Sequence, residues 1–229
     1  MYPKINLTCT SYKRLELFKE TFKSFFECCQ DLDLINRFII CDDGSPLEDI
    51  CEMRDLYPEF EIYPNPGKGQ AASLNHLFNL VDTEYCFHCE DDWLFIKEGH
   101  FIRRLFDVMF DDPAIRNVSL RNWSGNEVQS INNPLLKYNL HRYRPGKEVF
   151  SEVLKTNSAW YGLTFNPSLH HLPTIKSLGP LDEGFNPNSR RWDRAQAKKY
   201  MDLGWKVANI LEGPWIEHIG QDRSIYQQT

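Results

Sequence analysis

Two clusters of adjacent carboxylates in this chain of 229 residues could bind a cation or transfer protons. Asp42 and Asp43 directly follow one apolar run, and Glu90, Asp91 and Asp92 follow another. Adjacent carboxylates repel one another and raise each other's pKa values unless a cation neutralises them or solvent screens them. A divalent metal ion is the economical explanation, and the alternative for either cluster is a solvated turn that caps the next helix.

The segments around these clusters alternate between strand-like and helical patterns over residues 1–120. Strands are predicted near 5–9, 37–41, 59–63, 85–89 and 117–120, and helices near 15–26, 47–56, 71–81 and 100–110. This alternation is typical of an α/β fold with a mostly parallel central sheet and helices on both faces. Ligands of such sheets bind beyond the carboxyl ends of the strands, where both acidic clusters are expected.

The second half of the chain gives weaker signals. Periodicity fades between 122 and 149, which predicts long loops over the site instead of sheet. A strand near 160–165, a helix near 193–203 and a last strand near 206–210 follow. His170 and His171 have no acidic or cysteine neighbours, so we expect them in a loop. No repeat or linker divides the chain, which predicts one domain over 1–229.

Composition excludes several classes of protein. Lys and Arg number 26 against 32 Asp and Glu, and the net charge of −6 has the wrong sign for coating nucleic acid. No apolar run reaches the length of a membrane helix, and the first residues lack the apolar core of a signal peptide. We therefore expect no transmembrane segment and a cytoplasmic location, with peripheral membrane association left open. Neither a GxGxxG nor a GxxxxGK[ST] segment occurs, which disfavours dehydrogenases and P-loop enzymes.

The seven cysteines are odd in number, and several lie in apolar runs, so we expect reduced thiols. One CxxC pattern, Cys86 to Cys89, falls inside a predicted strand and lacks a second pair of ligands at suitable spacing. Both a zinc site and a thioredoxin-like redox centre are therefore disfavoured.

Four short segments, in this order and spacing, resemble the GT-A glycosyltransferases, most closely the inverting family 2 type. They are Thr10 to Arg14, Ile40 to Ser45, Asn65 to Asn75, and Glu90-Asp91-Asp92-Trp93 at the position of the DXD motif of that family. The resemblance spans roughly residues 4 to 220. It implies a single GT-A (Rossmann-like) domain, with a half that binds the nucleotide-sugar at about 1–120 and a half that binds the acceptor at about 121–229.

The resemblance also assigns the residues that would hold the donor nucleotide. These residues are Thr10, Tyr12, Arg14, Asp42 and Asp43. A carboxylate among them can accept the imide N–H of the base. The resemblance further places Lys68 near the diphosphate, where an ammonium acts as a point charge, and the alternative is a solvated lysine in a loop.

The DXD-type cluster of the family binds a divalent cation, Mn²⁺ or Mg²⁺, that bridges the two phosphates of the donor. By this resemblance Asp92 is a direct metal ligand, and Asp91 contributes to the donor site. Cys89 stands where the family usually has its first Asp, which leaves the roles of Glu90 and Asp91 open. His218 is the further expected metal ligand, with a surface or packing residue as the alternative.

The resemblance implies Asp193 as the catalytic base, because it stands eleven residues before Gly204, as in the family. Trp192 replaces the usual Glu. Asp193 could instead be a charge that the helix dipole favours at an N-terminus, and Asp182 or Glu183 is the alternative base.

These assignments imply a glycosyltransferase that moves a sugar from a nucleoside diphosphate sugar, with UDP as the nucleotide, to a hydroxyl acceptor with inversion. The acceptor would be a glycan, a lipid-linked molecule or a protein, selected by residues at about 122–157. A nucleotidyltransferase is one alternative, although it would normally carry a glycine-rich basic loop after the first strand. A module that binds sugar-nucleotide or glycan without turnover is the other.

Overall fold

A nine-stranded sheet runs through the centre of the computed structural model, which describes residues 1–121, 128–132, 136–141, 150–151, 156–157, 162–184 and 191–220. The strand order is β3 (Phe60–Pro64), β2 (Ile35–Asp42), β1 (Ile5–Ser11), β4 (Tyr85–Glu90), β11 (Ser168–His171), β6 (Ile115–Ser119), β12 (Lys206–Ile210), β8 (Lys137–His141) and β7 (Val128–Asn132). Strands β11 and β8 run antiparallel to the other strands of this sheet, which are parallel to one another. The predicted mostly parallel α/β sheet is therefore confirmed.

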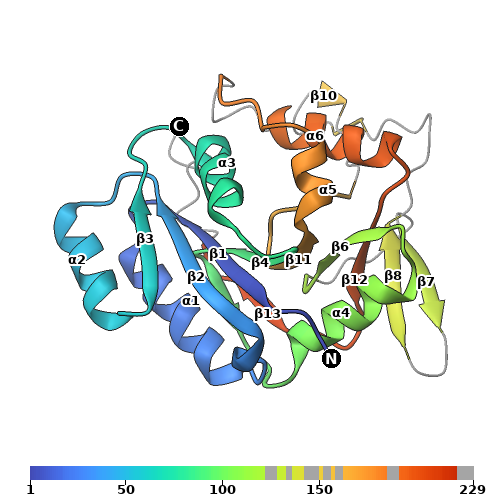
Figure 1. Ribbon diagram of the computed structural model, residues 1–229, viewed down its shortest axis with the longest axis horizontal. Helices are drawn as coiled ribbons and strands as arrows, with labels where there is room; N and C mark the ends of the chain where they lie inside the picture. Colours follow the sequence, from blue (N-terminus) through green and yellow to red (C-terminus); the bar gives the residue numbers. More distant parts are fainter. Residues whose placement is uncertain are drawn as a thin grey trace.

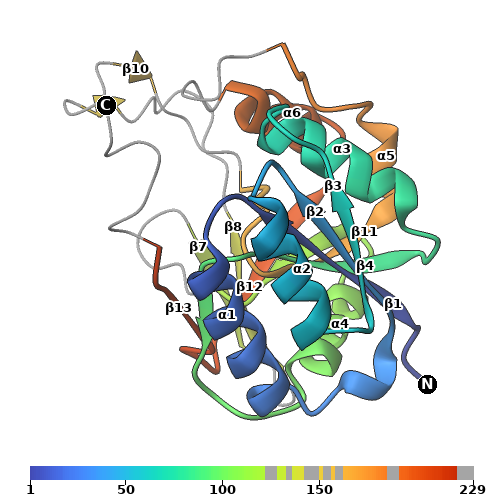
Figure 2. The ribbon, with the colours of Figure 1, turned by 90° about the vertical axis from the view of Figure 1, so that its left-hand side faces the viewer.

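Helices cover both faces of the sheet, as predicted (Figures 1 and 2). On one face α1 (Leu15–Cys28), α2 (Leu47–Leu56) and α4 (Phe101–Asp111) enclose one apolar cluster. On the other, α3 (Gln70–Leu80), α5 (Leu172–Ser177) and α6 (Arg191–Asp202) enclose a second. The stripe of Phe18, Phe22 and Phe25 on α1 explains the first cluster, because each ring is fully buried and each burial contributes about 2–3 kcal/mol.

Smaller elements complete the fold. A short 3₁₀ turn, η1 (Leu32–Leu34), precedes β2, and β9 (Phe150–Ser151) pairs with β10 (Thr156–Asn157). A two-stranded ribbon of β5 (Trp93–Phe95) and β13 (Ile216–His218) places His218 opposite Trp93. The backbone N–H of Ile219 then donates to the carbonyl of Asp92 at 3.0 Å. The ribbon therefore holds the late part of the chain against the end of β4.

Three expectations for the second half are wrong. The stretch 122–149 contains β7 and β8, which extend the sheet at its edge, where long loops were expected. In the stretch 160–165 the described residues, from 162 on, form no strand, and β11 begins instead at Ser168. It includes His170 and His171, which were expected in a loop. A polar inward face explains this error, because Ser168 and the fully buried His170 give the sequence no apolar alternation.

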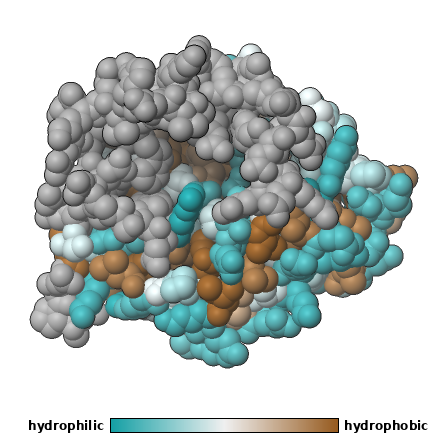
Figure 3. Space-filling model, turned by 180° about the vertical axis from the view of Figure 1, so that it is seen from behind, coloured by the Kyte–Doolittle hydropathy of each residue, from teal (hydrophilic) through white to brown (hydrophobic). Residues whose placement is uncertain are grey.

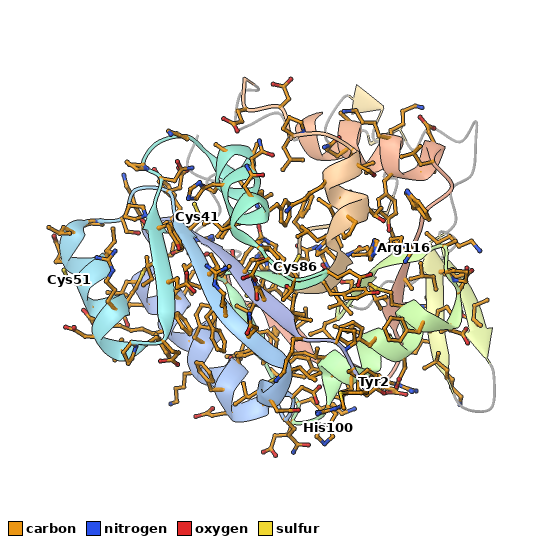
Figure 4. The ribbon with its side chains drawn as sticks, in the orientation of Figure 1. Tyr2, Cys41, Cys51, Cys86, His100 and Arg116 are labelled. Atoms are coloured by element: carbon orange, nitrogen blue, oxygen red, sulfur yellow. The ribbon has the colours of Figure 1, made fainter. Side chains whose placement is uncertain are left out.

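All seven cysteines are free thiols in the structure, and Cys51 is the exposed one. Figure 4 shows Cys41 and Cys86 within the fold and Cys51 at its outer edge on α2.

Seen from behind, the surface carries hydrophobic patches between hydrophilic ones (Figure 3). None of the described helices combines the length and the apolar character needed to cross a bilayer.

Candidate active site

The parallel strands β1 and β4 pair side by side, with Thr10 opposite Glu90, so the two acidic residues after β4 lie beside the segment that follows β1. Asp91 is fully buried, and its Oδ2 accepts hydrogen bonds from Ser11 Oγ at 3.0 Å and from the Tyr12 N–H at 3.1 Å. Arg14 Nη2 donates to Oδ1. Burial raises the pKa of Asp91 to about 7, against the lowering effect of Arg14. Asp91 therefore ties the end of β4 to the segment after β1.

Asp92 has a different set of partners. Its Oδ2 accepts a hydrogen bond from Arg14 Nη1 at 2.6 Å and lies 3.3 Å from His218 Nε2. Its Oδ1 is buried and has no hydrogen-bond partner. Burial opposes the charge of Asp92, but His218 and Arg14 outweigh it and hold the pKa of this carboxyl below its usual value. A buried acceptor without a partner costs free energy, so Oδ1 is the atom of this cluster that is available to a ligand.

Glu90, the first residue of the acidic cluster, faces a third set of partners. Gln70 Nε2 donates to its Oε1 at 2.6 Å, and Trp93 Nε1 lies 3.4 Å from Oε2. Burial and the neighbouring Asp92 raise the pKa of Glu90. The three adjacent acids therefore do not share one ion.

A divalent cation fits the groups around Asp92. Asp92 Oδ1 and the imidazole of His218 are oxygen and nitrogen donors of the kind that Mn²⁺ accepts. Gly220 packs directly against Asp92, because a Cβ there would lie 2.7 Å from Asp92 Cβ, 2.8 Å from its Cγ and closer still to Oδ2. No group of three or more His, Cys, Asp or Glu side chains suited to a metal occurs among the described residues, so the remaining ligands would be water and phosphate oxygens.

The segment after β2 is organised by Asp42. This fully buried carboxylate accepts hydrogen bonds from the Gly44 N–H at 3.0 Å, the Ser45 N–H at 2.7 Å and the Ser45 Oγ at 2.7 Å. Ser45 Oγ also accepts the N–H of Lys13 at 2.9 Å, where Lys13 has a φ of 53°. Asp42 therefore holds the turn after β2 in place through its contacts with Gly44 and Ser45.

Asp43 holds the next segment along the edge. Its Oδ1 accepts the N–H groups of Lys68 at 2.9 Å and Gly69 at 3.0 Å, just before α3 begins. Burial raises the pKa of Asp43, and these two backbone donors lower it. The Lys68 side chain is exposed, Thr10 is buried, and Tyr12 is 36% exposed with the Lys13 ammonium 5.1 Å from its ring centroid. The exposed groups of this edge are therefore a phenol and two lysines.

The described hydrogen bonds of Asp182 and Glu183 do not involve this cluster. Asp193 lies in the first turn of α6, and its side chain falls outside the described part, as does that of Trp192. Asp182 and Glu183 are exposed. Asp182 Oδ1 accepts the Gly184 N–H at 2.9 Å, and Glu183 Oε1 accepts Asn75 Nδ2 at 2.7 Å. The choice among these carboxylates stays a prediction.

Sequence reasoning missed several members of the site. Ser11, Gln70 and Gly220 each contact the acidic cluster, and nothing in their local sequence marks them. Ser11 has the clearest available signal, because it is the last residue of a strand that ends beside an acidic strand end. Gly220 acts through a contact with a residue 128 positions earlier in the sequence, at a place where no turn needs a glycine.

An α/β sheet whose parallel strands end in a carboxylate and imidazole site, beside an exposed polar edge, defines a GT-A-like domain. The family model for glycosyl transferase family 2 matches residues 9–160, and the chain belongs to that family. Among the curated proteins no relative matches the sequence.

Two solved structures show the same fold at low sequence identity. One is the mannosyltransferase PcManGT from Pyrobaculum calidifontis in complex with GDP-Man and Mn²⁺, with a TM-score of 0.64, 13% identity and coverage of 100% of this chain and 60% of that chain. The other is GalNAc-T7 with UDP, GalNAc and Mn²⁺, with a TM-score of 0.63, 11% identity and coverage of 94% and 44%. The chain thus spans less than two thirds of the length of either protein.

Proposed function

We propose that this protein is a metal-dependent inverting glycosyltransferase that moves a sugar from a nucleoside diphosphate sugar, with UDP as the nucleotide, to a hydroxyl acceptor. The observation that carries the proposal is the buried Asp92 after β4 in a family 2 chain, whose Oδ1 has no partner and whose Oδ2 lies 3.3 Å from His218 Nε2. The two similar structures that hold Mn²⁺ with a nucleotide or nucleotide-sugar support it.

Asp92 and His218 would hold the cation, with Mn²⁺ or Mg²⁺ as the candidates. A bound divalent cation neutralises charge on the departing diphosphate as the bond to the sugar breaks. The chain provides two ligands among its described residues, and a diphosphate provides oxygen ligands of the same hard type. Two protein ligands leave open positions, which a site for metal-assisted group transfer requires.

The nucleotide would lie along the edge formed by the ends of β1 and β2. Tyr12 is exposed there and offers a ring face to the base, and Asp43 retains acceptor capacity for the N–H of a base. Thr10 and Asp42 support this edge from inside, and Asp42 does so through its three contacts with the turn that follows β2. Lys68 is exposed next to Asp43, where its ammonium can reach a phosphate.

Asp193 is the proposed base. It would take the proton from the acceptor hydroxyl as that oxygen attacks the anomeric carbon on the face opposite the leaving diphosphate, which inverts the configuration. Its place in the first turn of α6 lets the helix N-terminus stabilise the carboxylate. Asp182 and Glu183 are the alternatives, and their asparagine or glutamine variants are to be compared with Asp193→Asn in the same assay.

Ligand-dependent melting tests this proposal. A ligand that binds the native state raises the melting temperature, so UDP, GDP and CMP are screened with and without Mn²⁺. We expect one nucleoside diphosphate to stabilise the protein with Mn²⁺ present, Asp92→Asn to abolish the metal-dependent part, and the exposed Asp55→Asn on α2 to preserve it. An unchanged metal response in Asp92→Asn would refute the assignment of the site.

Transfer is measured next, because binding alone would equally suit a module without turnover. The stabilising donor is incubated with hydroxyl acceptors, and release of the nucleoside diphosphate is followed. We expect Asp193→Asn to lower kcat by at least about 100-fold, as for loss of a general base, with donor binding retained. Full activity in Asp193→Asn would remove this residue from the mechanism.

A further inference from the structure

Arg14 lies on the acidic cluster and joins its two aspartates. The guanidinium extends from the residue before α1, with Nη1 on Asp92 Oδ2 at 2.6 Å and Nη2 on Asp91 Oδ1. Its Nε is buried and has no partner, and the side chain is 22% exposed. Two carboxylates on one guanidinium fix its position, so Arg14 is held against the proposed metal ligand.

The guanidinium also changes the charge that a cation would meet. Arg14 places a positive charge between Asp91 and Asp92, while Glu90 is occupied by Gln70 and Trp93. Asp92 is 6% exposed, so charges at its two oxygens are poorly screened by water. A cation on Oδ1 would share one carboxylate group with the cationic Nη1 on Oδ2.

We propose that Arg14 is a built-in counter-ion that weakens the binding of bare divalent metal at Asp92 and makes metal binding depend on the diphosphate. The inference rests on the proposed function, because it takes Asp92 and His218 as the metal ligands. Without a diphosphate, the metal meets the repulsion of Arg14 and obtains two protein ligands. With a diphosphate, the phosphate charges offset that repulsion, and the guanidinium gains a third anionic partner beside Asp91 and Asp92.

This role differs from the contact with the base or ribose that the sequence resemblance implies for Arg14. It makes Arg14 a positioning residue for the metal, which acts through Asp92 and through charge. Because coupling between two ligands is reciprocal, Arg14 also sets how strongly Mn²⁺ increases the affinity for the diphosphate.

Titration of the folded protein with Mn²⁺ tests the inference without any turnover. Free Mn²⁺ is measured by electron paramagnetic resonance for wild type, Arg14→Gln and Arg14→Lys, each with and without UDP. We expect Arg14→Gln to bind bare Mn²⁺ about tenfold more tightly, because a like charge is removed from the ligand. Arg14→Lys keeps the charge and is expected to stay within about threefold of wild type. UDP should increase Mn²⁺ affinity by a larger factor in wild type than in Arg14→Gln.

Loss of Arg14 also leaves Asp91 buried without its cation, so folding is checked by circular dichroism and melting. If Arg14→Gln fails to fold, the double variant Asp91→Asn, Arg14→Gln replaces it, since this pair removes one charge of each sign. Because its net charge at the site equals that of wild type, the double variant is compared with Asp91→Asn in place of wild type, and we expect it to bind bare Mn²⁺ more tightly than Asp91→Asn does.

The outcomes separate the two proposals. Bare Mn²⁺ affinity in the folded Arg14 variant that equals or falls below that of its reference, wild type or Asp91→Asn, would overturn the counter-ion role. Mn²⁺ binding that survives in Asp92→Asn would overturn the metal site itself, whatever the Arg14 variants do. Loss of binding in Asp92→Asn together with the tenfold gain in Arg14→Gln supports both.

Discussion

Low pH is expected to destabilise this protein because two histidines are buried in the central sheet. His88 on β4 and His170 on β11 are both 0% exposed. Thr8 Oγ1 lies 3.0 Å from Nδ1 of His88, and the His170 ring nitrogens lie 2.9 Å from Ser168 Oγ and 3.1 Å from Asn117 Nδ2. Burial lowers the pKa of each histidine to about 3, and His170 adds to the lowering at His88. Both rings are therefore neutral in the fold at every pH at which the protein would be handled.

The free-energy change follows from the difference between the folded and unfolded states. An unfolded histidine takes up a proton near pH 6.5 and the folded one does not, so stability is intact above pH 6.5 and is lost as the pH falls toward 3. Each histidine removes about 1.4 kcal/mol per pH unit in this window. At pH 5 the pair removes about 4 kcal/mol, a large part of the roughly 5–15 kcal/mol that stabilises a typical domain.

Urea unfolding at pH 7 and pH 5 measures this loss. Asp91 acts in the opposite direction, because its raised pKa favours the folded state as the pH falls, so the comparison is between variants and wild type. His88→Asn and His170→Gln should each reduce the pH-dependent loss by about 2 kcal/mol. His76→Gln, on the partly exposed His76 of α3, is the control. If both buried variants keep the wild-type difference between the two pH values, these rings are not the neutral groups described here.

Three further outcomes are expected. Gly220→Ala places a methyl group against Asp92 and should weaken Mn²⁺ binding in a calorimetric titration at least about tenfold; an unchanged affinity would show that the corner is roomier than the contact distances imply. Asp42→Ala removes three hydrogen bonds from the turn after β2 and should lower the free energy of unfolding by about 2–4 kcal/mol in urea, and a loss below about 0.5 kcal/mol would contradict this role. Phe22→Ala opens a cavity beneath α1 and should cost about 3–5 kcal/mol in the same assay, whereas a cost near that of a surface substitution would mean that the ring is not enclosed.

The sequence predicts the first half of the fold well because packing there uses apolar side chains. The helix α2, for example, begins and ends at the predicted residues, Leu47 and Leu56, and β4 ends at the predicted acidic cluster. Apolar stripes and strand runs in this half follow the periods of their secondary structures, so local patterns and tertiary contacts agree.

The strands β7, β8 and β11 escaped prediction because a row of polar side chains crosses the sheet on one face, whereas β12 lies at the predicted residues, 206–210. Register pairs connect the members of this row from strand to strand: Thr8, His88, Ser168, Ser119, Asn209, Asn139 and Ser130. Polar residues at inward positions give no apolar alternation, and their stability depends on partners in neighbouring strands, such as the 2.8 Å bond from Ser130 Oγ to Asn139. These partners are set by tertiary pairing, which local sequence does not contain.

The acidic cluster shows the same limit at the site. Its composition predicts a nearby cation. The guanidinium of Arg14 and the imidazole of His218 both contact Asp92. The resemblance places Arg14 at the nucleotide, and the 78 positions that separate it from Asp92 along the chain hide their contact. The role of Gly220 is hidden for the same reason.

The three adjacent acids lie at the end of β4 and in the turn that follows it, and each has its own set of partners. Both carboxylate oxygens of the buried Asp91 accept hydrogen bonds, from Ser11, Tyr12 and Arg14. Those of Glu90 accept hydrogen bonds from Gln70 and Trp93. Asp92 alone among them keeps an oxygen without a partner, beside an imidazole and opposite a guanidinium. The repulsion that the sequence suggested is therefore relieved mainly by the chain's own donors, and under the proposal made above the affinity for a metal ion would depend on one oxygen and on the charge that Arg14 places next to it.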